Sequence, residues 1–160
     1  MRRFTPVELA IGVALVGAIL AVAVPTFVRE VHASRLVEPT DGLARIGANA
    51  IAYAEANNRF QDSAPMTPSV PPRGKKEADP PGTWDTPAWK ALDFRPAPEG
   101  APHAYAFAFD APKPNEAFVA RARGDLDGDG LLSTFEIRGG IAPADRPKLV
   151  PGMYVEAELE

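Results

Sequence analysis

The chain has 160 residues, of which 46% are hydrophobic and 24% charged, and its formal net charge is −4 at pH 7. It has no cysteine, which excludes disulfide bonds and a thiol nucleophile. Its lysines and arginines are scattered without forming a basic stripe, so binding of nucleic acid by this chain alone is not expected.

The first element is an apolar stretch from Leu9 to Val24, in which every residue is apolar or glycine. As a helix it measures roughly 24 Å, and its apolar flanks bring it close to the ~30 Å core of a bilayer. Backbone polar groups in lipid must bond within the segment, so residues 4–28 are predicted to form a membrane-spanning helix. Arg2 and Arg3 favour a cytoplasmic N-terminus.

A secretory signal peptide is the alternative interpretation of this stretch. Ala21-Val22-Ala23 loosely matches the small-residue pattern of a signal-peptide cleavage site. Glu8 argues against that interpretation, because an acid beside an apolar membrane helix is costly and usually has a functional partner.

The segment Phe4-Thr5-Pro6-Val7-Glu8-Leu9, followed by the apolar helix and Pro25, resembles the N-terminus of type IV prepilins and type II secretion pseudopilins. The resemblance implies a short basic leader, residues 1–3, removed by a prepilin peptidase between Arg3 and Phe4, and N-methylation of Phe4. It also implies that Glu8 neutralises the Phe4 amine of a neighbouring subunit during assembly. Arg3 stands where the family has Gly, and Pro6 where it has Leu.

Residues 29–60 are predicted to continue the helix in amphipathic form. Leu43, Ile46, Ala50, Tyr53 and Ala54 recur at helical spacing and indicate the face that packs on a globular head. The segment from Glu38 to Gly42 contains Pro39 and is predicted to break the helix, with Asp41 able to cap a new start.

Residues 61–160 are predicted to form a β-rich head. Its first part, residues 61–82, holds six of the chain's 18 prolines and is predicted to be a loop without regular structure. Its proline spacing also permits a polyproline II ligand, although a surface loop is the simpler interpretation.

The remainder of the head is predicted to contain a short helix and several strands. Thr86 and Pro87 are typical of a helix start, and the aromatic side chains of residues 84–94 are expected in the core. Strands are predicted at residues 105–109, 118–123, 135–138 and 153–157, with a hairpin loop at 110–116. The fold class predicted is therefore α+β, with a long N-terminal helix packed on a small antiparallel sheet, as in pilins.

Residues 125–136 match the calcium-loop pattern D-x-D-x-D-G-x5-E. The pattern predicts a structural Ca²⁺ held by six residues, which are Asp125, Asp127, Asp129, Leu131 through its carbonyl, Ser133 and Glu136. A metal-free Asp/Gly turn is the alternative. Bound calcium would stabilise a head that has no disulfide, and the resemblance raises this expectation because pseudopilins and some pilins use calcium in their heads.

No catalytic constellation is present in the sequence, so an enzyme is not expected. The function predicted is a structural subunit of a type IV pilus-like filament, with type II secretion pseudopilin and non-polymerising, membrane-anchored calcium-binding protein as alternatives. The expected location is the inner membrane and then a periplasmic or extracellular filament. Expected partners are other pilin-like subunits, the peptidase and the assembly machinery.

Overall fold

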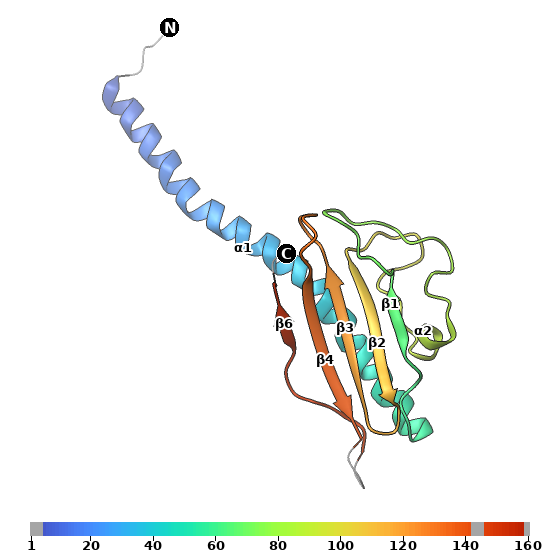
Figure 1. The fold of residues 1–160 in the computed structure, drawn as a ribbon. Coiled ribbons are helices and arrows are strands. Elements are labelled where there is room, and N and C mark those ends of the chain that lie inside the picture. Colours follow the sequence, from blue (N-terminus) through green and yellow to red (C-terminus); the bar gives the residue numbers. More distant parts are fainter. Residues whose placement is uncertain (1–4, 142–145, 159–160) are drawn as a thin grey trace. The chain divides into compact units, whose positions relative to one another are not determined.

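The computed structural model describes residues 5–141 and 146–158 (Figure 1). The elements are α1 (Pro6–Asn57), β1 (Ala64–Thr67), α2 (Pro87–Ala91), β2 (Tyr105–Lys113), β3 (Ala117–Gly124), β4 (Ser133–Gly140), β5 (Lys148–Leu149) and β6 (Tyr154–Glu156). They divide into two compact units, residues 1–35 and residues 36–160. The α+β class, with an N-terminal apolar helix and an antiparallel sheet, is confirmed.

The first unit contains the N-terminal part of α1. The segment Pro6–Phe27 is long and apolar enough to cross a membrane, and none of it is buried by the rest of the described chain. Its 22 residues correspond to about 33 Å of helix, which matches the hydrocarbon core of a bilayer. Pro25 does not interrupt the helix, and the hydroxyl of Thr26 beside it donates to the Val22 carbonyl at 2.9 Å.

The predicted break at residues 38–42 is wrong, because α1 continues through it to Asn57. Pro39 is buried, and the hydroxyl of Thr40 donates to the Leu36 carbonyl at 2.6 Å. A Cβ built on Gly42 would lie 2.5 Å from the Phe107 ring, so only glycine lets this aromatic side chain approach the helix so closely. Packing of the head therefore outweighs the local helix cost of Pro39 and Gly42, about 3 and 1 kcal/mol respectively.

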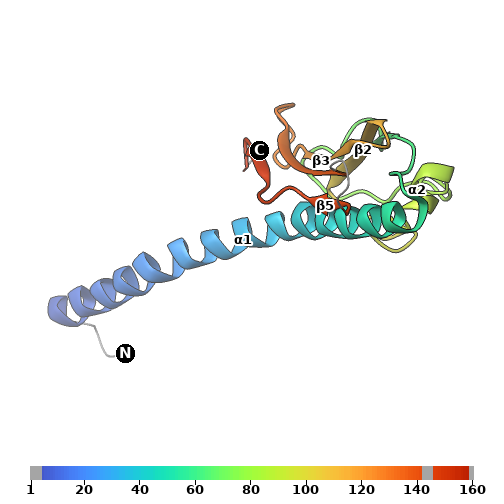
Figure 2. The ribbon, with the colours of Figure 1, turned by 90° about the horizontal axis from the view of Figure 1, so that it is seen from below.

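The second unit is built around one antiparallel sheet in the order β1-β2-β3-β4-β5, with β6 also paired to β4. The C-terminal part of α1 lies along one face of this sheet (Figure 2). The helix contributes the predicted face to a core that also holds the aromatic side chains of the strands and of α2. The members of this core cluster with no exposed area are Leu43, Ile46, Ala50, Phe60, Trp89, Leu92, Phe107, Phe109, Ala120 and Ala122.

The predicted strands are all present, and the hairpin loop is shorter than expected because β2 runs to Lys113. The short helix α2 is also confirmed, with the Thr86 hydroxyl accepting from the Trp89 N–H. One further contact was not foreseen. Glu38 of α1 accepts from the N–H groups of Ala104 and Tyr105 at 2.8 and 2.9 Å, which fixes the start of β2 to the helix.

The proline-rich segment 61–82 is only partly the structureless loop that the sequence predicts. It contains β1, which pairs with β2, and both Pro71 and Pro72 are buried. Two isolated bridges attach it further along, Arg73 with Asp125 and Glu77 with His103. Segment 61–82 is therefore held against the sheet by main-chain hydrogen bonds, although most of it lacks helix or strand.

Candidate functional site

The head of α1 is closed by a reciprocal pair of hydrogen bonds between Thr5 and Glu8. The Thr5 N–H donates to Glu8 Oε2 at 2.8 Å, and the Glu8 N–H donates to the Thr5 hydroxyl at 3.3 Å. This arrangement is a capping box, which satisfies two of the backbone donors left free at a helix start. Pro6 occupies the first helical position, where its missing N–H costs nothing and its fixed φ suits the helix.

Glu8 therefore has a structural partner within its own helix, and its carboxylate remains exposed. The predicted processing residues, Arg3 and Phe4, and the leader 1–3 lie outside the described residues. Pro6 is compatible with the helix start that Thr5 and Glu8 define.

The second candidate site is the acidic loop between β3 and β4. One carboxylate oxygen from each of Asp125, Asp127 and Asp129 lies within 4.8 Å of the others. Each aspartate also accepts a backbone N–H from within the loop, at distances of 2.8, 3.1 and 2.7 Å respectively. Gly128 and Gly130 have φ of +85° and +95°, a left-handed conformation that glycine adopts without strain.

The burial of Asp125 distinguishes this loop from an ordinary acidic turn. Asp125 is 1% exposed, and its Oδ2 has no hydrogen-bond donor among residues 5–141 and 146–158. The Arg73 guanidinium approaches it, with Nε at 3.8 Å from Oδ2. Leaving a buried carboxylate oxygen without a donor is costly, and a divalent cation satisfies such an oxygen. The three aspartates are thus a donor set that suits a hard cation.

The carboxylates that the structure groups are those of Asp125, Asp127 and Asp129, and Glu136 is not among them. The Leu131 N–H donates to Asp129, and the buried Ser133 hydroxyl donates to the Gly124 carbonyl at 3.2 Å. The Glu136 carboxylate is held by two arginines, with Arg121 Nε at 2.8 Å and Arg138 Nε at 2.7 Å. Ser133, Phe135 and Ile137 share the buried face of β4, so strand alternation directs Glu136 to the opposite face.

The ion pairs of Glu136 make the stability of the head dependent on pH. Burial alone raises the pKa of the Glu136 carboxyl, but the hydrogen bonds and positive charges of Arg138 and Arg121 outweigh it and lower that pKa. A depressed folded pKa contributes stability that is present above the unfolded value near 4.3 and is lost as pH falls through the folded value. In calcium-free buffer, Glu136→Gln is expected to lower the free energy of unfolding by about 1–3 kcal/mol at pH 7.

That difference between wild type and Glu136→Gln is expected to shrink as the pH is lowered below 4, because the wild-type carboxyl then also becomes neutral. Urea unfolding at a series of pH values measures it. A difference that stays constant across this range would show that the charge of Glu136 contributes nothing.

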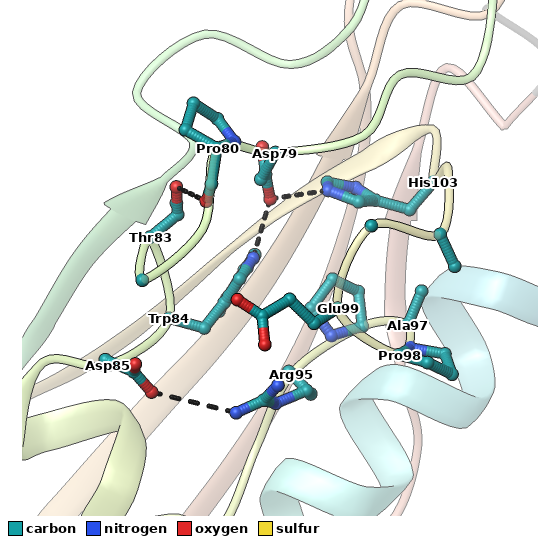
Figure 3. Close-up of a pocket in the computed structure, with 14 residues that line it drawn as sticks. Asp79, Pro80, Thr83, Trp84, Asp85, Arg95, Ala97, Pro98, Glu99 and His103 are labelled. Atoms are coloured by element: carbon teal, nitrogen blue, oxygen red, sulfur yellow. Dashed lines mark hydrogen bonds and ion pairs between the residues drawn. The ribbon is translucent and has the colours of Figure 1, made fainter.

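A small hollow lies near the end of the proline-rich segment (Figure 3). Asp79 Oδ2 accepts from Trp84 Nε1 at 2.6 Å and contacts His103 Nε2 at 2.7 Å, while His103 Nδ1 contacts the Tyr105 carbonyl at 2.9 Å. The hollow has a volume of only about 30 Å³, enough for about one water molecule. Its polar groups hold residues 79–84 against the start of β2, so it is a structural contact.

Sequence reasoning missed Arg73, Asp79 and His103 as partners of distant residues. The buried ring of His103 contacts the Asp79 carboxylate and the Tyr105 carbonyl. No local signal pairs Arg73 with Asp125, because 52 positions separate them and only the bridge between their backbones brings them together.

Comparisons with known proteins give no further assignment. No family model matches the chain, and no curated protein or solved structure is significantly similar to it. The candidate sites therefore stand on the sequence pattern and on the geometry described above.

Proposed function

We propose that this chain is a subunit of a pilin-like filament, anchored first in a membrane through the N-terminal part of α1 and then assembled through the same helix. The observation that carries the proposal is the segment Pro6–Phe27. It is a 22-residue apolar helix, unburied by the rest of the described chain, with one capped acid at its start. The resemblance of residues 4–9 to prepilins is the reason for proposing a type IV pilus-like filament.

The physical argument begins with the exposed side chains of this helix. Large apolar residues recur on all its sides and are more than half exposed, namely Val7, Leu9, Ile11, Val13, Leu15, Val16, Ile19, Leu20, Val22, Val24 and Phe27. A helix that is apolar all round is stable only in lipid or inside a bundle of helices. Both environments are needed by a subunit that moves from the membrane into a filament.

In this proposal, Glu8 determines the axial register between the α1 helices of adjacent subunits. A carboxylate in an apolar helix bundle is costly unless a positive charge is close, and cleavage before Phe4 would create an amine four residues away in sequence. Pairing that amine with Glu8 of a neighbouring subunit fixes the axial offset between adjacent helices. The leader 1–3, the peptidase and methylation at Phe4 belong to this proposal.

We further propose that the acidic loop holds a structural Ca²⁺ through Asp125, Asp127 and Asp129. The buried, donor-free Oδ2 of Asp125 supports a cation there. The ion would hold the β3–β4 connection rigid in a head without disulfides.

Crosslinking tests the filament proposal directly, because the chain has no cysteine of its own. A single cysteine introduced at Leu15 is expected to give disulfide-linked dimers in membranes or sheared filaments, since adjacent helices pack within a disulfide's reach. A cysteine at the exposed Ser69 in the head is the matched control. A solitary membrane anchor would give no dimers at Leu15, and that result would overturn the proposal.

A further inference from the structure

Arg73 is fixed beside the acidic loop by its backbone, independently of its side chain. The Gly74 N–H donates to the Asp125 carbonyl at 2.8 Å, and Arg73 forms a parallel bridge with Asp125. Gly74 has φ of +66°, and a Cβ there would lie 3.3 Å from the Asp127 carbonyl oxygen, so glycine permits this close approach. These main-chain contacts therefore place Arg73 beside the acidic loop.

The side chain of Arg73 is held less firmly than its backbone. It is 69% exposed, and its Nε lies 3.8 Å from Asp125 Oδ2, beyond hydrogen-bond distance. It neutralises the buried carboxylate by charge alone, because Oδ2 has no hydrogen-bond donor. An exposed arginine on a fixed backbone can turn its guanidinium into solvent without disturbing the loop.

A divalent cation at Asp125 would meet this positive charge directly. Two positive charges a few ångströms apart repel each other, and in a partly solvated site the repulsion costs on the order of 1 kcal/mol or more. The cation and the guanidinium therefore cannot both be held by Asp125 Oδ2 without a loss in affinity.

We propose that Arg73 is an exchangeable internal counter-ion, which neutralises Asp125 when the acidic loop is empty and is displaced when a divalent cation binds. The inference rests on the calcium proposal above. Arg73 accordingly sets the cation affinity of the loop without being a ligand, and it keeps the cation-free loop folded.

The test is calcium titration of the full chain in detergent by isothermal calorimetry, using wild type and Arg73→Gln. We expect Arg73→Gln to bind CaCl₂ about three- to tenfold more tightly, because the competing charge is gone. In EDTA the same variant is expected to unfold at lower temperature than wild type. A residue with a merely structural role would not tighten calcium binding.

Lys75→Gln is the matched control, because it removes one positive charge two residues away and Lys75 pairs with Glu77 at 3.1 Å. It is expected to change calcium affinity less than twofold. Equal dissociation constants for wild type and Arg73→Gln would overturn the counter-ion inference while leaving the calcium site intact. Calcium binding by Arg73→Gln alone would support the inference, and absence of binding by every variant would overturn both proposals.

Discussion

Replacing Glu8 by Leu is expected to abolish filament assembly, while the protein still enters the membrane. The substitution removes both the charge that selects register and the carboxylate that closes the capping box with Thr5. Loss of a cap costs about 1 kcal/mol, which destabilises only the first turn of a helix that lipid already stabilises. The assembly defect is therefore expected to come from the missing charge.

Glu8→Gln separates these two roles. Glutamine completes a capping box as glutamate does, so the helix start is expected to remain intact. Its neutral amide does not pair with an amine charge, so assembly is expected to fall nearly as far as in Glu8→Leu. Electron microscopy of sheared filaments, together with membrane fractionation, measures both steps.

Glu30→Gln is the control, because it removes an exposed carboxylate from α1 beyond the apolar segment. It is expected to assemble normally. Normal filaments from Glu8→Gln, combined with few from Glu8→Leu, would assign Glu8 to the helix cap alone. That outcome would remove the register argument from the proposed function.

The elements that the sequence predicted correctly are those with a local physical signal. The apolar run from Leu9 to Val24 can satisfy its backbone only as a helix wherever it is placed in lipid. The alternation of residues 105–109 and the Thr86-Pro87 start of α2 likewise depend on near neighbours in the chain. These signals were sufficient for the α+β class and for four of the six strands described, whereas β1 and β5 were not predicted.

The wrong predictions concern residues whose conformation is decided by distant contacts. Gly42 looked like part of a helix break, but it is the position at which the Phe107 ring packs against α1. Segment 61–82 was predicted to lack regular structure, but Ala64–Thr67 forms β1 against β2. In both cases the deciding contact is distant in sequence, and no pattern within a short window reports it.

In the acidic loop, too, the sequence pattern predicted one part of the structure and not another. Its spacing predicted the grouping of Asp125, Asp127 and Asp129 correctly, because a glycine-rich turn brings alternate side chains together. It also predicted Glu136 as a ligand, although the same sequence predicted a strand at residues 135–138. The structure places the Glu136 carboxylate between Arg121 and Arg138. A spacing pattern specifies distance along the chain, whereas ligand direction depends on the element that follows.

Calcium is expected to stabilise the head substantially, and Asp125 is expected to account for most of that gain. A ligand that binds only the folded state adds RT ln(1 + [L]/Kd), which is about 2.7 kcal/mol at a concentration of 100 times Kd. For a domain of this size that gain corresponds to a rise in Tm of roughly 5–10 °C. Thermal unfolding of the full chain in detergent, with CaCl₂ or with EDTA, measures it.

Asp125→Asn is expected to lose nearly all of this calcium-dependent rise, because it replaces the one buried carboxylate of the loop with a neutral amide of the same shape. It is expected to be stable in EDTA, since its side-chain oxygen can still accept the Gly128 N–H and it no longer buries a charge. Asp62→Asn, at an exposed position outside the loop, is expected to keep the full rise. An equal rise in Asp125→Asn and wild type would place the cation elsewhere, and the buried, donor-free oxygen of Asp125 would then have to be neutralised by Arg73 alone.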